Sequence, residues 1–305
     1  MPLPIILDCD PGTDDAVALL LSLASPELEV LAITAAGGNV GLDHTLANAI
    51  GLVQLAGSAA PVYAGADRPL LGSFVNAPRV HGADGLGGIM LPRGGAPKEG
   101  IAADRIRSIL RTAARPVTLV GIAPATNLAL ALATEPPIAG RIEQIVLMSG
   151  AWGEGNATPA AEFNAFNDPE ALAILLGCGR PVIFATLELT AQALVTGERI
   201  TALRRSGSGR CLSVACNILA SVPAAPHLGG SALHDPCAVA WLIRPELFTT
   251  RTGNVRVDLG PGLSRGRTVI DRWDRTGEAH NALVLETLDA EGFFSLLTER
   301  LAQLP

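Results

Sequence analysis

Lysine is almost missing from this sequence of 305 residues, because Lys98 is the only one. No basic run occurs anywhere, and 22 basic residues against 29 acidic ones leave a formal net charge of -7. A nucleic-acid backbone or an anionic membrane is therefore a poor match as a partner. We expect a small-molecule substrate instead.

Paired cysteines and membrane-spanning segments are missing as well. The five cysteines include no CxxC pair and are odd in number, which suits a reducing compartment and disfavours zinc held by thiolates. The N-terminus lacks the charged region and the length of a signal peptide, and no apolar stretch is long enough to span a bilayer. We predict a cytoplasmic protein.

Apolar residues are plentiful, at 49% against 17% charged, which is sufficient for a sizeable buried core. No linker-like stretch separates two compositions, so we predict one domain over residues 1–305. Short β-branched runs alternate with helical patterns, and this alternation predicts an open, mostly parallel, Rossmann-like α/β sheet with helices on both faces. The expected strands of this part are 4–7, 29–34, 116–120, 142–148 and 181–185.

The C-terminal part has a different pattern, with strand candidates joined by short loops and a last helix over 289–301. We expect it to add mixed strands to the sheet, at 254–259, 268–272 and 282–285. Two stretches rich in Gly and Pro, 65–100 and 206–233, resist regular assignment. Long loops in a compact domain are more often functional than idle, and ligands of parallel sheets bind beyond the carboxyl ends of the strands.

Four carboxylates lie within eight residues directly after the first strand, in the segment DCDPGTDD of residues 8–15. Asp14 and Asp15 would be favoured in a first helical turn by capping and by the helix dipole alone. Asp8 and Asp10 end an apolar strand, where a partly buried anion is costly unless a cation or several donors meet it. A turn rich in Asp without His or Cys favours calcium or magnesium over zinc.

Further motifs follow in a fixed order along the chain. They are GGN at 37–39, HGADGLGG at 81–88, PATNL at 124–128, GNATPAAEFN at 155–164, DPEA at 168–171, LHDP at 233–236 and SRGRTV at 264–269. Together with DCDPGTDDA at 8–16, this set resembles the inosine-uridine-preferring nucleoside hydrolase family over most of the chain. The resemblance implies the nucleoside hydrolase fold and an N-glycosyl hydrolase of purine or pyrimidine salvage that cuts ribonucleosides into ribose and free base.

The resemblance also implies a calcium site. Its ligands would be Asp10, Asp15, Asp235 and the backbone carbonyl of Ile122, with water and two ribose hydroxyls in the remaining positions. Asp10 would act as the general base on a calcium-bound water, which a carboxylate touching that water can reach. The sugar would pass through an oxocarbenium-like transition state, which nearby anions stabilise.

Seven further positions match residues that bind the ribose or pack near it in the family: Asp14, Asn39, Met148, Asn156, Glu162, Phe163 and Asn164. Glu162 and Asn164 alternate around Phe163, so both point to one side if this segment is extended. Asn39 and Asn156 each follow glycine and could be turn residues only, and Met148 could be a core residue.

Two histidines match positions on the base side of the family's site. His234 would protonate the departing base, and a pKa near 6.5 suits this role at neutral pH. His81, in the glycine-rich loop, would be its companion. Residues 222–230 contain no aromatic residue, where the family often has one that stacks on the base, so the sequence leaves base preference open.

Two rival functions share parts of this pattern. A haloacid dehalogenase-type phosphatase also has DxD after a strand, but it needs Thr or Val where Gly12 stands and a lysine for which only Lys98 is available. A non-catalytic calcium-binding or riboside-binding protein would not need the complete set of Asp, Asn and His residues. A dinucleotide enzyme would carry GxGxxG after the first strand, and this chain does not. As in the family, we expect a homodimer or homotetramer.

Overall fold

The computed structural model describes residues 1–224 and 229–305. Within these residues one sheet of nine strands runs through the chain in the order β10-β9-β11-β6-β5-β4-β1-β2-β3. Neighbouring strands are parallel except that β9 is antiparallel to both β11 and β10. The strands are β1 (Leu3–Cys9), β2 (Leu28–Ala35), β3 (Val62–Ala64), β4 (Val117–Gly121), β5 (Ile142–Met148), β6 (Val182–Ala185), β9 (Phe248–Val257), β10 (Thr268–Asp271) and β11 (Ala282–Leu288). The predicted open α/β sheet with mixed C-terminal strands is confirmed.

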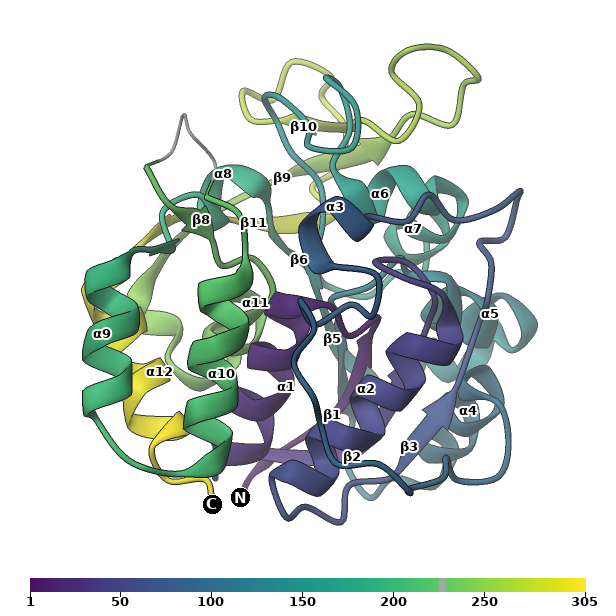
Figure 1. Cartoon of the computed structure of the whole chain (residues 1–305). Coiled ribbons are helices and arrows are strands. Elements are labelled where there is room, and N and C mark those ends of the chain that lie inside the picture. The colour runs from purple at the N-terminus through teal and green to yellow at the C-terminus, as the bar shows by residue number, and fades with distance from the viewer. Residues whose placement is uncertain (225–228) are drawn as a thin grey trace.

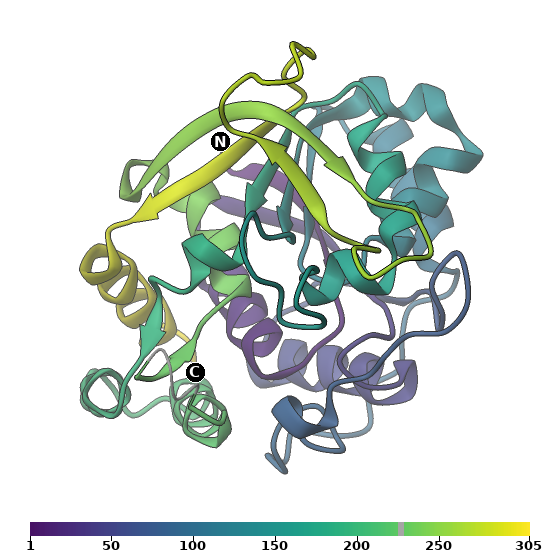
Figure 2. The same cartoon turned by 90° about the horizontal axis from the view of Figure 1, so that it is seen from above.

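Helices cover both faces of the sheet (Figures 1 and 2). One apolar cluster joins the sheet to α1 (Thr13–Ala24), α2 (Leu42–Leu55), α9 (Gly197–Arg205), α10 (Arg210–Ser221), α11 (Asp235–Ile243) and α12 (Ala290–Leu301). A second cluster, on the opposite face, includes α4 (Ala102–Thr112), α5 (Thr126–Thr134) and α7 (Pro169–Leu176).

Strand β1 shows how the sequence produces this burial. Ile5 and Leu7 belong to the first cluster and Ile6 to the second, because successive side chains of a strand point to opposite faces. All three are fully buried, as expected for a parallel strand covered on both sides. The same alternation turns Asp8 toward the face of α5, where its carboxylate meets Asn127.

Two sequence predictions of regular structure were wrong. Residues 206–233 are not irregular throughout, because 210–221 form α10 and 231–232 form the short strand β8 (Ser231–Ala232), which pairs with β7 (Leu194–Val195). The apolar side chains of α10 recur at helical spacing, but the nearby Gly and Pro residues obscured them. Strand β9 begins at Phe248 rather than 254. Residues 249–252 are polar and exposed, so no alternation of buried and exposed residues reveals this part of the strand.

The segments that follow β1, β2, β4, β5 and β6 all start from the carboxyl ends of these parallel strands. Figure 1 shows α3 (Pro78–His81), α6 (Phe163–Asn167), α8 (Leu187–Thr190) and β8 at this end of the molecule, away from both termini. Across the described residues, we find no helix whose length and hydropathy would let it cross a membrane. The loops at the carboxyl ends are where a ligand of this sheet would bind.

Candidate functional site

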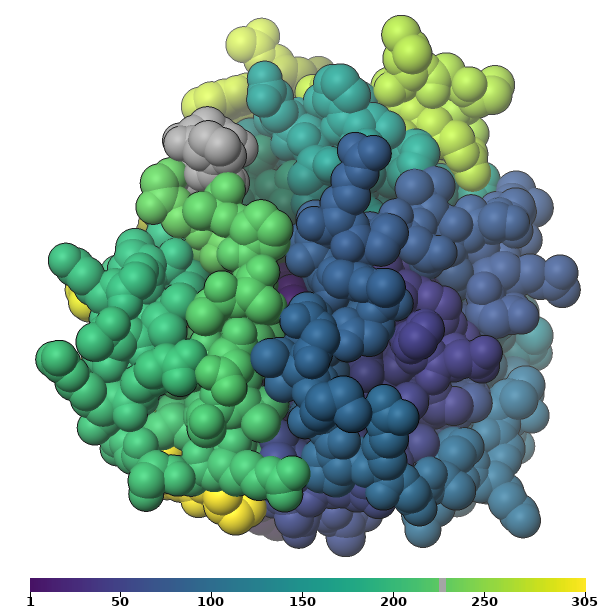
Figure 3. All heavy atoms as spheres, viewed as in Figure 1, coloured from purple at the N-terminus to yellow at the C-terminus, as the bar shows by residue number. Residues whose placement is uncertain are grey.

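A cavity of about 720 Å³ opens at the carboxyl ends of the strands. In the space-filling view, residues of α10 and of the loop after β3 lie side by side, and N-terminal residues are visible between them (Figure 3). Nearly all of the predicted site residues line this cavity: Asp14, Asn39, His81, Ile122, Met148, Asn156, Glu162, Phe163, Asn164, His234 and Asp235. Residues from seven separate segments of the sequence are thus brought together by the fold.

Asp10 and Asp15 are fully buried and lie behind the lining rather than on it. Carboxylate oxygens of Asp14, Asp15 and Asp235 lie within 4.8 Å of one another, so each could contribute one ligand to the same ion. This group contains Asp14, which the sequence suggested as a ribose-binding residue, and does not contain Asp10. Asp10 is nevertheless adjacent, because its backbone N–H donates to Asp15 Oδ1 at 3.0 Å.

Asn39 holds Asp10 and Asp15 in place. Its backbone N–H donates to Asp10 Oδ2 at 2.7 Å, and its side-chain Nδ2 donates to Asp15 Oδ2 at 2.9 Å and to the Asp10 carbonyl at 3.1 Å. Gly38 lies so close to Asp10 that a Cβ there would be 2.0 Å from Oδ2. The turn after β2 therefore orients the acidic centre in addition to lining the cavity.

Burial and mutual repulsion raise the pKa values of these carboxyls. Desolvation is the largest cause for Asp10, Asp15 and Asp235, followed by the charge of a neighbouring aspartate. The pKa of Asp15 rises to about 7, and those of Asp10 and Asp235 rise well above the ordinary value. Asp8, two residues before Asp10, has a pKa of about 7 mainly because of its own burial.

These residues fit a divalent cation. Within the described chain, Asp10 Oδ1 is buried with no hydrogen-bond partner, and burial together with neighbouring aspartates raises the pKa values of Asp10 and Asp235. A dication would satisfy that oxygen and offset the repulsion. The candidate ligand atoms of these aspartates are all oxygens, which suits a hard cation rather than zinc.

Glu162 links the strand end of β5 to the cavity. It is the N-cap of α6, and its carboxylate accepts from the backbone N–H groups of Asn164, Ala165 and Gly150 at 2.8 to 2.9 Å. The segment 162–164 is not an extended strand, since α6 begins at Phe163, so the condition for the alternating arrangement of Glu162 and Asn164 is not met. Burial raises the pKa of Glu162, while the backbone N–H groups lower it.

Asn164 connects two strand ends. Its Nδ2 donates to the carbonyls of Ile122 at 3.2 Å and Met148 at 3.1 Å. Asn156 is exposed and accepts a hydrogen bond from the Phe163 N–H at 2.8 Å, which joins the loop after β5 to α6. The Ile122 carbonyl, expected to be a metal ligand, is thus held in place from one side by an amide.

His81 and His234 reach the cavity from two segments that are far apart in the sequence. His81 ends α3, and its Nδ1 accepts from the Thr13 backbone N–H at 3.1 Å. Burial is the main cause that lowers the pKa of His81; the charge of Asp14 raises it, and that of His234 lowers it. His234 precedes α11, and its Nδ1 lies 2.7 Å from Thr190 Oγ1.

Sequence reasoning missed Thr13, Glu188 and Thr190. Thr13 lies inside the DCDPGTDDA motif and could have been included from it. Glu188 accepts from the backbone N–H groups of Trp152 at 3.1 Å and Gly153 at 2.7 Å, so it anchors the loop after β5. No motif distinguishes Glu188 or Thr190 from other residues of a short turn.

The region without aromatic residues, 222–230, is described only in part, and 225–228 lie outside the described residues. Val222 and Pro223 line the cavity. Among the described lining residues, Phe163 provides the one phenyl, phenol or indole ring.

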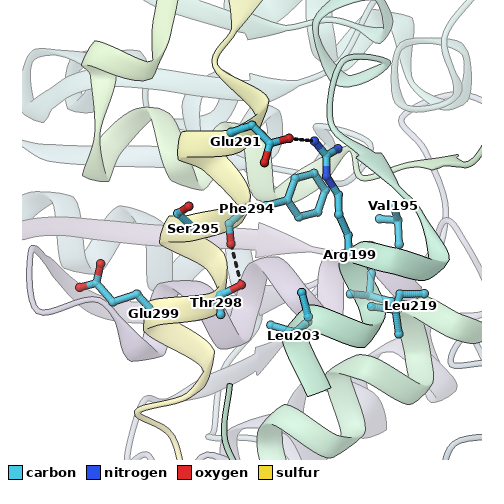
Figure 4. A pocket seen from close by; sticks show the side chains of 11 residues that line it. Val195, Arg199, Leu203, Leu219, Glu291, Phe294, Ser295, Thr298 and Glu299 are labelled. Atoms are coloured by element: carbon cyan, nitrogen blue, oxygen red, sulfur yellow. Dashed lines mark hydrogen bonds and ion pairs between the residues drawn. The ribbon is translucent and has the colours of Figure 1, made fainter. Parts of the chain in front are cut away.

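A second cavity, of about 440 Å³, lies between α9 and α12 (Figure 4). Arg199 crosses it, paired with Glu291 at 2.5 Å and stacked over the Phe294 ring at 4.2 Å. Val195 and Leu219 line both cavities and form a shared wall. The described residues of this second cavity include no cluster of carboxylates and histidines, so the chemistry belongs to the larger one.

Fold and site together define an α/β protein with a buried acidic centre suited to a metal ion. The model of the inosine-uridine preferring nucleoside hydrolase family matches residues 5–295, and the chain belongs to this family. It is a nucleoside hydrolase, which cleaves ribonucleosides into ribose and base. The family match excludes the phosphatase alternative.

Relatives and solved structures agree with this assignment. The chain is 43% identical over 307 residues to the pyrimidine-specific ribonucleoside hydrolase RihA of Salmonella schwarzengrund, with 99% of both chains covered. A plant nucleoside hydrolase, PpNRh1, superposes with a TM-score of 0.92 at 33% identity over 99% of this chain and 100% of that one. The purine-preferring ribonucleoside hydrolase of Gardnerella vaginalis gives 0.90 at 32% identity over 98% of each.

Proposed function

We propose that this nucleoside hydrolase acts through a calcium ion at the acidic centre, with Asp10 as the general base. The observation that carries the proposal is the buried group of aspartates at the end of β1, of which Asp10 Oδ1 has no hydrogen-bond partner among the described residues. Asp10, Asp15, Asp235 and the Ile122 carbonyl would hold the ion. When bound, a dication supplies Lewis-acid activation of water and orientation of substrate oxygens.

Asp10 accepts the proton of the attacking water as the general base, and the backbone N–H of Asn39 fixes the direction of its carboxylate through Oδ2. The ribose lies over the acidic centre, where Asp14, Asn39, Asn156, Glu162 and Asn164 bind its hydroxyls. The surrounding carboxylates stabilise the positive charge that the sugar ring gains as the base departs. Met148 and Phe163 exclude water beside the sugar.

The base lies between His81 and His234, and His234 protonates it as it leaves. We propose pyrimidine ribonucleosides as the preferred substrates, because relatives 43% identical over 99% of the chain are pyrimidine-specific, whereas the purine-preferring neighbour is 32% identical.

Activity assays with four substrates test this proposal. The protein is incubated with uridine, cytidine, inosine and p-nitrophenyl riboside, with and without a chelator, and free ribose, base and nitrophenol are measured. We expect uridine and cytidine to exceed inosine in kcat/KM, the chelator to abolish turnover, and calcium to restore it better than magnesium. Full activity in the chelator would contradict the metal role, and faster inosine cleavage would contradict the pyrimidine preference.

We also propose that the chain forms a single catalytic domain over residues 1–305 that assembles as a homodimer or homotetramer and acts in the cytoplasm. The shared nine-stranded sheet, which joins N-terminal and C-terminal segments, supports the single domain. Light scattering coupled to size-exclusion chromatography measures the assembly, and a monomer at micromolar concentration would contradict it.

A further inference from the structure

Thr190 is a buried residue that no sequence motif singled out. It ends α8, the short turn after β6, and is 0% exposed. Its Oγ1 lies 2.7 Å from His234 Nδ1 and 3.2 Å from the Leu187 carbonyl oxygen, to which it donates. Within the described part of the chain, this contact with Thr190 is the sole hydrogen bond of the His234 imidazole.

The two contacts of Thr190 determine how the histidine ring is held. A hydroxyl has one proton, and Thr190 gives it to the Leu187 carbonyl, as Thr side chains in helical turns do. When the ring is an imidazolium, the form that can protonate a departing base, its Nδ1–H donates to this Thr190 oxygen and its Nε2 carries the second proton. Nδ1 is thereby occupied toward the protein interior, and Nε2 is the ring nitrogen left for a ligand of the cavity.

The turn that carries Thr190 is itself fixed at both ends. The Leu187 N–H donates to the Gly150 carbonyl at 3.0 Å, and Glu188 accepts from Trp152 and Gly153. Gln192, just beyond the turn, donates to the Glu286 carbonyl at 3.0 Å. A side chain on such an anchored turn can hold a partner in one orientation.

We propose that Thr190 is a positioning residue for departure of the base: its hydroxyl orients the His234 imidazole so that Nε2 faces the leaving group. Thr190 does not touch the substrate, since it is absent from the cavity lining among the described residues. The inference rests on the proposed proton transfer by His234. The inference adds to that proposal that Thr190 sets the orientation of the His234 ring.

A matched control lies in the same turn. Thr186 is the N-cap residue of α8 and is also 0% exposed, but its Oγ1 has no hydrogen-bond partner in the described residues. Thr186→Val and Thr190→Val make the same change of shape at equally buried positions. Only Thr190→Val removes a contact with His234, whereas Thr190→Ser keeps the hydroxyl.

The experiment compares these three variants with His234→Ala and with the double variant Thr190→Val/His234→Ala, on uridine and on p-nitrophenyl riboside, whose leaving group needs no proton. We expect Thr190→Val to lower kcat for uridine by about 10- to 100-fold with little change in KM, and to change p-nitrophenyl riboside turnover by less than about 3-fold. Thr190→Ser should recover most of the uridine activity, and Thr186→Val should match the wild type. In the His234→Ala background, Thr190→Val should have no further effect on uridine.

Two results would overturn the inference alone. The first is an equal loss of kcat for uridine in Thr190→Val and Thr186→Val. The second is a loss of kcat in Thr190→Val that is the same on both substrates, while His234→Ala still affects uridine more than p-nitrophenyl riboside. If the proposed proton transfer by His234 is wrong, the result is different. In that case His234→Ala itself lowers kcat by the same factor on both substrates, and the proposed role of Thr190 is contradicted as well.

Discussion

Neighbouring aspartates of the first motif have different surroundings, and these surroundings separate their roles. Asp8 points to the α5 face, where Thr34 and Asn127 donate to its Oδ1 at 2.5 and 2.8 Å. Asp10 reaches the strand end with one oxygen held by Asn39 and the other free. Asp8 Oδ2 also lacks a partner among the described residues, so position separates the two: Asp8 faces α5 within the core, whereas Asp10 lies beside Asp15 at the candidate site.

Replacement of Asp10 tests this difference. We expect Asp10→Ala to lower kcat for uridine by about 10³-fold or more, because a general base and a metal ligand are lost together. The metal-free variant should unfold at the same or a higher temperature than the wild type, since one charge is removed from a buried cluster of like charges. The exposed Asp43→Ala in α2 is the control and should retain full activity. A variant of Asp10 with near-normal kcat would rule out the proposed base.

At the scale of elements, the turn between β2 and α2 positions the acidic centre. It supplies Asn39, whose backbone and side chain both bond to aspartates, and Gly38, which allows the backbone to approach Asp10. The sequence indicated Asn39 as a ribose contact, and the hydrogen bonds show that it also holds the carboxylates. Spacing along the chain could not predict this, because the partners are 24 and 29 residues apart.

A methyl group at Gly38 tests the role of this turn. In Gly38→Ala the new Cβ would lie 2.0 Å from Asp10 Oδ2 and 3.1 Å from Pro124 Cδ, so the Asp10 carboxylate must move. We expect kcat to fall by about 10- to 100-fold, because misplacement of a catalytic group by an ångström has effects of this size. Gly41→Ala is the control from the same turn, since its Cβ would meet nothing within 4 Å. Equal activity of the two variants would show that the turn adapts freely.

For the whole molecule, the buried carboxylates link stability to pH and to metal. The folded-state pKa values of Asp8 and Asp15 are about 7, against an ordinary value of 3.8. Between these two values the folded protein binds more protons than the unfolded chain, so the stability of the metal-free protein falls as pH rises from about 4 to about 7. For Asp8 alone this loss is on the order of 4 kcal/mol.

Calcium should reverse this loss, because it replaces the protons as the source of positive charge. We expect thermal unfolding in a chelator to show a lower Tm at pH 8 than at pH 5.5, and excess calcium to raise the Tm more at pH 8. The measurement is calorimetry at both pH values, with magnesium as the comparison ion. A chelated protein that becomes more stable with rising pH would contradict the burial of these charges.

From the sequence alone, the α/β alternation, the strand that ends in the acidic motif and the ordered set of family motifs could be predicted. These features are local. The continuous apolar run of β1 indicates burial on both faces, and the carboxylate-rich turn follows it directly in the sequence. It failed where polar or exposed residues concealed regular structure, as at the start of β9, and where Gly and Pro lay beside a helix, as at α10.

Which side chains meet depends on how the whole chain folds. The pairing of Thr190 with His234, 44 residues apart, and the joining of two strand ends by Asn164 depend on strand order and on the packing of loops. The raised pKa values of the aspartates have the same origin, because desolvation requires the helices and loops that cover the strand end. Contacts between distant residues leave no periodic signal in one sequence, and for this physical reason they appear only when the chain is folded.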